Sequence, residues 1–446
     1  MFAHEDQVPL ATLATHQPTL REFDVGQNGF LPSDLPLTIL PDAYYKPWET
    51  VIHQLSELIH GRELRAKVER LPVLSVDHLH TTPEWRRAYL ILSFLAHGYV
   101  WGGDKPSEIL PPSITVPLLE VSTHLDLPPV ATYAALNLWN FTSSSPQLTS
   151  PDALHALHTF TGTEDESWFY IISVAMEAQG AVIMPFMLEA LKAAGRKDYL
   201  TIAVALDDLS SCIRQLKSLL GRMYEKCNPQ VFFHQIRPFL AGSKNMGPAG
   251  LPRGVYYDEG DGKGDWIQLR GGSNGQSSLI QFLDVVLGVE HVASGNSTPE
   301  PECGGGEMSF HEEVRAYMPG PHRRFLEQIA NRGSIRDLVT QLGNSPEEQT
   351  LREAFQAATR TLADFRNKHL EIVARYITIP ARKHASGAAG KVNLASTLSG
   401  EYGVAGEKIQ ELTGTGGTAL LPFLKQVRDD TVRAGNTQCP TGALSS

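Results

Sequence analysis

The chain has 446 residues and a mass of 48.9 kDa, a length that corresponds to two or three domains. Hydrophobic residues make up 42% of it and charged residues 20%, which excludes a disordered chain and is typical of a packed globular protein. The net charge of −11 disfavours contact with phosphate backbones and anionic lipid heads. We therefore expect no nucleic-acid partner and no membrane partner.

The cysteines and the common short motifs indicate a cellular compartment and exclude further classes of protein. Four cysteines without a CxxC pair are too few for a disulfide framework, and they favour a reducing, cytoplasmic compartment. The sequence has no P-loop and no HExxH motif. These spacings would have indicated nucleotide binding or a zinc protease.

The first part of the chain is predicted to form a small N-terminal domain, residues 1–125. Its apolar residues follow helical periodicity in two places, and proline and glycine interrupt the pattern elsewhere. The domain boundary is predicted between Pro112 and Pro129. The predicted elements, in chain order, are an irregular segment at 1–45, helices at 47–71 and 83–98, and a loop at 102–117.

The rest of the chain, residues 126–446, is predicted to form a large all-α domain. Apolar residues recur there with the period of a helix, and strand-like alternation is scarce. Segments rich in Gly, Ser and Pro at 242–275, 292–306 and 384–417 are predicted to be loops. The predicted helices cover residues 128–141, 166–192, 195–225, 228–240, 276–287, 307–318, 321–331, 346–380 and 417–433.

The helix predicted at 346–380 carries one continuous apolar stripe, and His369 occupies a position in that stripe. A buried histidine needs a partner for both ring nitrogens. Two interpretations follow: a core histidine bonded to a backbone carbonyl, or an axial ligand of a haem iron. The other stripe positions are Phe355, Ala358, Leu362, Phe365, Ile372, Tyr376 and Ile379.

Two other predicted helices carry polar residues among aromatic ones. Phe169, Ser173 and Glu177 share one face at helical spacing, so Ser173 is either the hydrogen-bonding point of an aromatic pocket or a core serine bonded to its own helix. Pro185 is predicted to kink this helix. Further on, Arg237 lies four residues after Phe233. It is either a clamp for a substrate carboxylate, or a surface or ion-paired arginine.

Five segments resemble the indoleamine 2,3-dioxygenase family. The first, RNKHLEIVARYITIP, resembles the helix of that family that carries the proximal haem ligand. The others read YMPGPHRRF, GGSNGQSS, GTGGT and LPPVATY. The resemblance runs in order through most of the chain, from about residue 71 to residue 428. The five segments are residues 366–380, 317–325, 271–278, 414–418 and 127–133.

The resemblance implies a helical haem-binding domain that holds one haem b per chain. It also implies oxidative opening of the indole pyrrole ring of L-tryptophan by O2, which gives N-formylkynurenine in the first step of the kynurenine pathway. An external electron donor would reduce the haem, and we expect a monomer. Apolar walls for the indole and a fixed cation for the carboxylate agree with this chemistry.

The resemblance also assigns roles to single residues. His369 matches the iron ligand, Asp284 an acidic residue near it, and Arg366 a basic residue at the haem edge. The remaining matches concern the distal pocket and the substrate. They are Phe169 and Ser173 around the indole, Tyr133 and Phe232 in the pocket wall, Arg237 at the substrate carboxylate, Gly272 over the distal haem face, and Thr415 in a glycine-rich loop that closes over the amino-acid end.

Two residues depart from the family pattern. Asn274 stands where the family usually has a small residue in the loop over the haem, and Leu136 replaces a small pocket residue. These departures leave two alternatives open beside the dioxygenase. One is a haem-binding sensor or signalling scaffold of the same fold with little turnover, and the other is oxidation of a different indole or a peroxidase-like activity.

Overall fold

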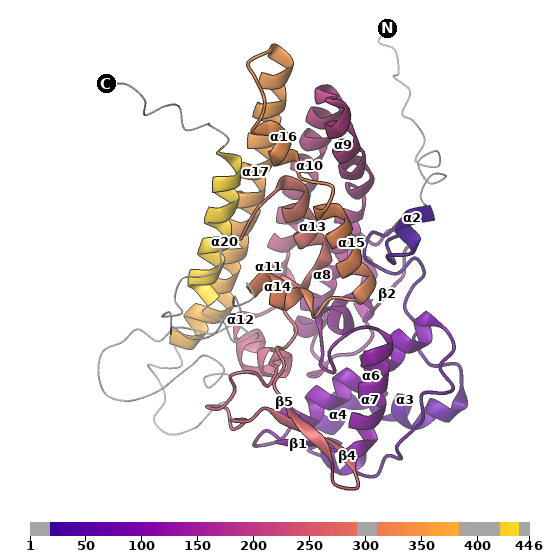
Figure 1. The fold of residues 1–446 in the computed structure, drawn as a ribbon. Helices are drawn as coiled ribbons and strands as arrows, with labels where there is room; N and C mark the ends of the chain where they lie inside the picture. Colours follow the sequence, from indigo (N-terminus) through magenta and orange to yellow (C-terminus); the bar gives the residue numbers. More distant parts are fainter. Residues whose placement is uncertain (1–17, 292–309, 383–419, 437–446) are drawn as a thin grey trace, which may run out of the picture.

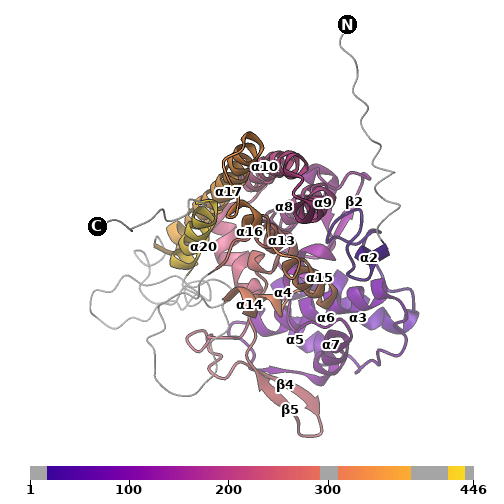
Figure 2. The ribbon, with the colours of Figure 1, turned by 45° about the horizontal axis from the view of Figure 1, so that its top comes forward.

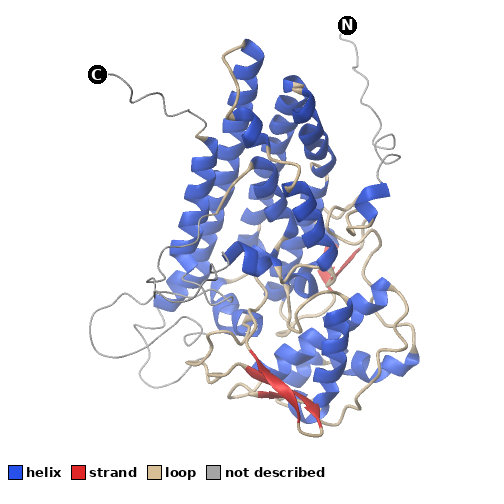
Figure 3. Cartoon of the chain, in the orientation of Figure 1, coloured by secondary structure: helices blue, strands red, loops and turns tan. Residues whose placement is uncertain are grey.

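The computed structural model of the protein describes residues 18–291, 310–382 and 420–436. Helices make up most of these residues, and the strands are few and short (Figure 3). The all-α class predicted from the sequence is therefore confirmed, whereas the division into two domains at residue 125 stays a prediction.

The first part of the chain packs short helices around one long helix, α6 (Thr82–Trp101). Thr81 and Glu84 form a capping box that starts α6, and every side chain from Arg87 to Trp101 is buried. The helix predicted at 47–71 is three helices, because the chain turns at Gln54 and again at Arg62, where φ is +60°. The shorter helices of this part are α2 (Pro18–Arg21), α3 (Lys46–His53), α4 (Leu55–His60), α5 (Leu64–Val68) and α7 (Pro112–His124).

Two predicted loops contain regular structure instead. The loop predicted at 102–117 contains the start of α7, because Pro112 occupies the first turn of a helix, where no amide donor is needed. The loop predicted at 242–275 contains the hairpin of β4 (Val255–Gly260) and β5 (Lys263–Ile267). The hairpin turns through Asp261 and Gly262 with φ of +51° and +75°, a turn signal that the prediction missed.

The strands form two small sheets. In the first, β1 (Ile109–Leu110) pairs in parallel with β4, and β4 pairs antiparallel with β5. In the second, β2 (Phe141–Ser143) pairs antiparallel with β3 (Leu154–Ala156). The helix predicted at 128–141 shrinks to the π-helical turn η3 (Ala134–Leu138), because the chain leaves it directly for β2.

Long helices form the other part of the molecule and run side by side, with α17 between α10 and α20 (Figures 1 and 2). Most of the predicted helices are found, some of them divided, and α16 was not predicted. The helices are α8 (Glu164–Ala181), α9 (Met184–Arg196), α10 (Tyr199–Gly221), α11 (Met223–Lys226), α12 (Pro229–Val231), α13 (Ser278–Leu287), α14 (Phe310–Arg315), α15 (Gly320–Ala330), α16 (Ile335–Val339), α17 (Pro346–Val373) and α20 (Leu420–Gly435).

Two of these helices place the candidate site. Thr163 caps α8 by accepting a hydrogen bond from the amide of Glu166, and the predicted kink is present as a 42° bend between α8 and α9. Ser345 and Glu348 form a capping box at the start of α17.

Within the described residues, no single helix has the length and apolar composition of a membrane span. The helices α8 and α9 meet both criteria only as a bent pair.

The predicted stripe of α17 is buried from Phe355 to Tyr376, apart from His369. Ile379, however, is 48% exposed, against the prediction. The reason is the π-helical turn η8 (Ala374–Thr378), which follows α17 directly. A π-turn holds an extra residue, so the apolar periodicity of the preceding helix does not continue through it.

Candidate active site

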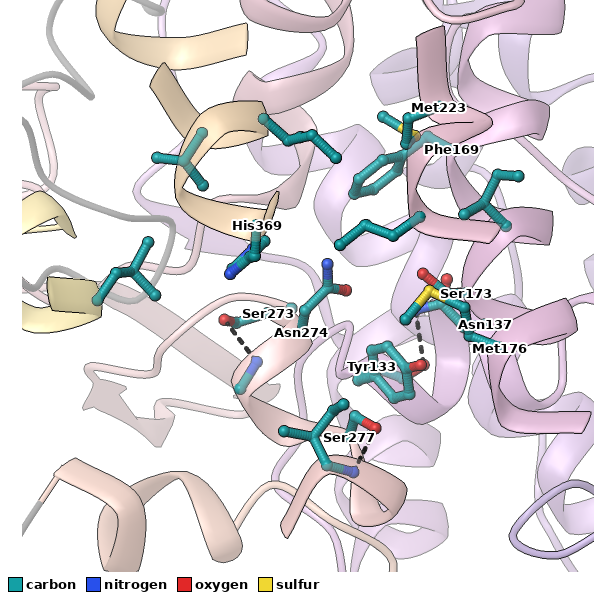
Figure 4. Close-up of a pocket in the computed structure, with 18 of the residues that line it drawn as sticks. Tyr133, Asn137, Phe169, Ser173, Met176, Met223, Ser273, Asn274, Ser277 and His369 are labelled. Atoms are coloured by element: carbon teal, nitrogen blue, oxygen red, sulfur yellow. Dashed lines mark hydrogen bonds between the residues drawn. The ribbon is translucent and has the colours of Figure 1, made fainter. Parts of the chain in front are cut away.

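One cavity gathers nearly all the residues that the sequence predicted for the site. It lies between α8, η3, α17 and the loop that precedes α13, and Figure 4 shows side chains from these segments facing one another across it. The predicted residues that line it are Tyr133, Phe169, Ser173, Phe232, Arg237, Gly272, Asp284, Arg366 and His369. Thr415 lies outside the described residues, and the individual roles of all ten residues stay predictions.

His369 projects from α17 into this cavity (Figure 4). The surrounding protein encloses it, yet its ring keeps some accessible surface because it faces the cavity. Within the described residues the ring has no hydrogen-bond partner, which does not support the core histidine bonded to a carbonyl. Burial, with a smaller contribution from Arg366, lowers the pKa of His369 to about 4. The imidazole is therefore neutral near pH 7, as an iron ligand must be.

Charged residues tie three segments together beside His369. The Arg366 guanidinium donates to Asp284 Oδ1 on α13, and to the Val427 carbonyl on α20 at 3.0 Å. Asp284 Oδ2 lies 3.1 Å from His291 Nε2. Asp284 and Arg366 are both largely buried, so each stabilises the charge of the other. This pairing fixes α17, and with it His369, against α13 and α20.

The wall formed by α8 and η5 (Phe232–Ile236) is aromatic and apolar. The rings of Phe169 and Phe232 are 4.9 Å apart at 57°, and Phe232 meets Tyr376 edge to face at 5.7 Å. Ser173 lines the same cavity one helical turn after Phe169, and in the described residues its hydroxyl makes no hydrogen bond to its own helix. The core-serine interpretation is therefore not supported. The wall offers a flat apolar ring a slot with a hydroxyl beside it.

Arg237 begins η6 (Arg237–Leu240) directly after η5. Its guanidinium carbon lies 5.6 Å from the centre of the Phe233 ring, as their spacing predicted, and the side chain is 1% exposed. Arg237 is therefore not a surface arginine. Burial lowers its pKa to about 10, which still leaves the side chain protonated near pH 7. A buried cation at the edge of an apolar cavity suits an anionic group on a ligand.

The loop before α13 brings its backbone close to the cavity wall. A Cβ atom at Gly272 would overlap the side chain of Leu136, so glycine permits the close approach of the two segments. Asn274 follows in η7 (Asn274–Gln276), and its amide points into the cavity between His369 and the α8 wall (Figure 4). Both residues that depart from the family pattern therefore border this cavity.

Several polar residues of the cavity were not predicted as site residues, among them Asn137 and Glu177. Helical spacing had already placed Glu177 on the same face as Ser173, without a role, and the same spacing from Tyr133 could have found Asn137. Glu177 Oε1 accepts from the Tyr133 hydroxyl at 3.0 Å and from the Ser277 hydroxyl at 2.6 Å. Burial raises the pKa of Glu177 to about 7. The cavity therefore holds a titratable carboxyl group.

The chain was compared with known proteins. A family model described as indoleamine 2,3-dioxygenase matches residues 19–434. Indoleamine 2,3-dioxygenase nanC of Aspergillus nanangensis is 39% identical over 424 residues, which cover 93% of this chain and 97% of the relative. Indoleamine 2,3-dioxygenase of Saccharomyces cerevisiae is 38% identical, with 93% of each chain covered.

A further relative bears a different substrate in its name. It is 6-hydroxytryptophan 2,3-dioxygenase fscD of Fusarium equiseti, which is 37% identical over 91% of this chain and 95% of its own. The family model spans nearly the whole chain, and all three relatives exceed 30% identity over nearly all of it. The chain therefore belongs to the indoleamine 2,3-dioxygenase family and is an oxidoreductase of the dioxygenase type.

Proposed function

We propose that the protein opens the indole pyrrole ring of L-tryptophan with O2 and releases N-formylkynurenine. The observation that carries this proposal is a single cavity that joins a neutral imidazole, an aromatic slot and a buried arginine. An indole fits the slot formed by Phe169 and Phe232, and the carboxylate of an amino acid fits Arg237. The indole and the carboxylate of L-tryptophan thus each have a matching surface in the cavity.

Haem b is the cofactor that family membership implies, and the residues present fit it. The His369 imidazole is neutral and has no hydrogen-bond partner among the described residues, and it faces a cavity with mostly apolar walls. Gly272 lets the loop before α13 pack closely against Leu136 at the edge of that cavity. When bound, haem would supply the reduced iron at which O2 reacts. His369 would hold the iron, and Arg366 would place a cation near the edge of the ring.

The protein itself then contributes binding, orientation and the exclusion of water. Phe169 and Phe232 would hold the indole away from solvent, and Arg237 would fix the other end of the substrate by its carboxylate. We further propose that the protein works as a monomer in the cytoplasm with an external electron donor. The buried free thiols of Cys212 and Cys227 support a reducing compartment, and burial raises the pKa of Cys212 to about 11.

Replacing Arg237 tests the proposed orientation of the substrate. Loss of one partner from a desolvated ion pair costs roughly 2 to 5 kcal/mol. We therefore expect Arg237→Ala to lower kcat/KM for L-tryptophan at least tenfold, on the order of 1.4 kcal/mol, with normal haem content. Tryptamine, which lacks the carboxylate, should lose much less, and Arg196→Ala on the exposed face of α9 should change neither. An equal loss for tryptamine and L-tryptophan would contradict the carboxylate role.

A further inference from the structure

Asn274 presents an open polar side chain to the cavity. It lines the cavity, and Figure 4 shows its amide pointing into the space between His369 and the α8 wall. Its side chain is exposed, whereas Gln276 and Ser277 of the same loop are buried. Neither Nδ2 nor Oδ1 of Asn274 has a hydrogen-bond partner among the described residues. The amide is therefore accessible to a ligand that enters the cavity.

The loop before α13 is held firmly in place. Gln276 is bonded at both ends: its Oε1 accepts from the Tyr133 amide at 2.8 Å, and its Nε2 donates to the Gly271 carbonyl at 2.8 Å. The Ser277 hydroxyl donates to Glu177 at 2.6 Å. These bonds fix the loop against η3 and α8, so the loop carries its remaining side chain at a defined place.

That remaining side chain is Asn274. The Ser273 hydroxyl accepts from the Gly275 amide at 3.2 Å, and the Asn274 carbonyl accepts from the Ser277 amide at 3.1 Å. In the described structure, Asn274 is thus the one polar side chain of residues 271–277 without a partner. A carboxamide has two donor hydrogens and an acceptor oxygen, and no bond fixes which end of this one faces the cavity. Asn274 can therefore turn its Nδ2 toward a ligand.

The position of Asn274 decides which ligand it can meet. His369 would hold a haem iron from one side, and the iron would keep an open site on its opposite side. The Asn274 amide lies in the direction in which the His369 ring faces the cavity, with Ser173 farther on in the wall itself (Figure 4). A small molecule at the open site would therefore have the Asn274 amide beside it.

We propose that Asn274 donates a hydrogen bond from Nδ2 to the small ligand on the open side of the haem iron, which is O2 in the proposed reaction. This inference rests on the proposed function, because it takes His369 to hold haem. A small ligand draws negative charge from a reduced iron, and a donor held in place stabilises that charge. Asn274 would thus orient the ligand and strengthen its binding.

Two other roles compete for the same amide. Asn274 would act by size alone if it only narrowed the cavity, and a leucine would then serve equally well. It would act on the substrate if it bonded L-tryptophan, although the aromatic slot and Arg237 already match the indole and the carboxylate. A donor to the ligand of the iron differs from both, because it acts when no substrate is present and depends on the N–H group.

The first test measures small ligands of the haem protein without substrate. Fluoride, an anion that accepts hydrogen bonds strongly, is titrated into the oxidised protein, and CO, which is nearly apolar, into the reduced protein. Asn274→Leu keeps the approximate size and removes the donor. We expect its fluoride affinity to fall at least about tenfold, as for a hydrogen bond to a charged group, and its CO affinity to change less than about threefold. Asn344→Leu, at an exposed position outside the cavity, should change neither.

Asn274→Ala separates the donor from the bulk of the side chain. If Asn274 donates, the alanine and leucine variants both lose fluoride affinity. Unchanged fluoride affinity in the leucine variant, with a gain in the alanine variant, would show that Asn274 only narrows the cavity and would overturn the proposal. Unchanged fluoride affinity in both variants, with weaker binding of L-tryptophan, would assign the amide to the substrate and would also overturn it.

The infrared spectrum of the CO complex gives a second measurement. A donor beside the ligand lowers the C–O stretching frequency, so we expect this frequency to rise in both Asn274 variants and to stay unchanged in Asn344→Leu. The band arises only from molecules that hold haem and CO, so it decides the question even if a variant folds poorly. The same frequency in the wild type and in both Asn274 variants would contradict the donor.

The two proposals fail in different ways. If the wild-type haem protein opened no indole, but lost fluoride affinity on Asn274→Leu as expected, the proposed function would be wrong and the donor role would stand. If L-tryptophan were opened, but fluoride bound the wild type and Asn274→Leu equally, the proposed function would stand and the inference about Asn274 would be wrong.

Discussion

His369 is the residue on which the assignment of haem depends. It is the residue that family resemblance matches to the iron ligand, and its ring faces the cavity without a hydrogen bond to the described residues. We expect His369→Ala to lose stable haem binding, because the variant lacks the imidazole that would hold the iron. Haem content and the Soret band of the purified protein measure this. His60→Ala, an exposed helical histidine, is the matched control. A Soret band of full intensity and unchanged position in His369→Ala would contradict the assignment.

Glu177 makes the stability of the protein depend on pH. Burial raises its pKa from 4.5 to about 7, so the folded protein favours the protonated carboxyl. The resulting stabilisation is fully present below the unfolded pKa and is lost as the pH rises through about 7. The loss is on the order of 3 kcal/mol in the free energy of unfolding.

The variant Glu177→Gln should remove this dependence, because an amide does not titrate and its oxygen can still accept from Tyr133. We expect the variant to unfold at higher denaturant concentration than the wild type at pH 8, and its stability to vary less between pH 5 and pH 8. Glu120→Gln, an exposed position on α7, should follow the wild type. Parallel pH curves for the wild type and Glu177→Gln would show that Glu177 titrates normally.

The residues of the candidate site could be predicted where a motif or a spacing pointed to them. His369 interrupts an apolar stripe, and Arg237 lies one helical turn after Phe233, so both stood out in the sequence. Asn137 did not stand out, because its position depends on a local backbone turn in which its Nδ2 donates to the Tyr133 carbonyl. That geometry arises in a π-helical turn, which apolar periodicity does not reveal.

At the scale of elements, α8 and α13 approach closely at Gly180. A Cβ atom there would overlap the buried side chain of Leu279. We expect Gly180→Ala to lower the free energy of unfolding by roughly 1 to 3 kcal/mol, the usual cost of overpacking a core. Denaturant unfolding measures this.

Gly195 provides the matched control, since it lies in α9 and a Cβ atom there would meet nothing within 4 Å. Gly195→Ala should leave the stability unchanged or raise it by up to about 1 kcal/mol, because alanine favours the helix. Equal effects of the two substitutions would show that α8 and α13 can separate at little cost.

The long helices could be predicted from the sequence, whereas the short elements could not. The buried stripe of α17 repeats over many turns, so its period is unambiguous. The strand β1 has two residues, and its pairing with β4 joins segments about 150 residues apart in the chain, so local sequence holds no signal for it. Proline marked the start of α7 and was taken for a loop, because proline suits both positions.

At the scale of the whole molecule, the cavity exists only in the complete fold. Its lining comes from segments that begin with Tyr133 and end with Val427, and the pairing of Asp284 with Arg366 joins two of them. The early part of the chain contributes by supporting this arrangement: the His97 ring bonds the carbonyl of Phe239 at 2.7 Å and the amide of Ala131 at 3.0 Å. The buried helix α6 thus holds the segments of Phe239 and Ala131, which lead into the cavity walls.

The most direct test of the central claim is the fate of oxygen during a reaction with L-tryptophan. The haem protein is reduced without air, mixed with L-tryptophan, and then exposed to 18O2, and the product is identified by mass spectrometry. We predict N-formylkynurenine that carries both atoms of one O2 molecule, formed by the wild type and by His60→Ala but not by His369→Ala. Absence of this product from the reduced wild-type haem protein, or a product with label in only one oxygen, would contradict the account.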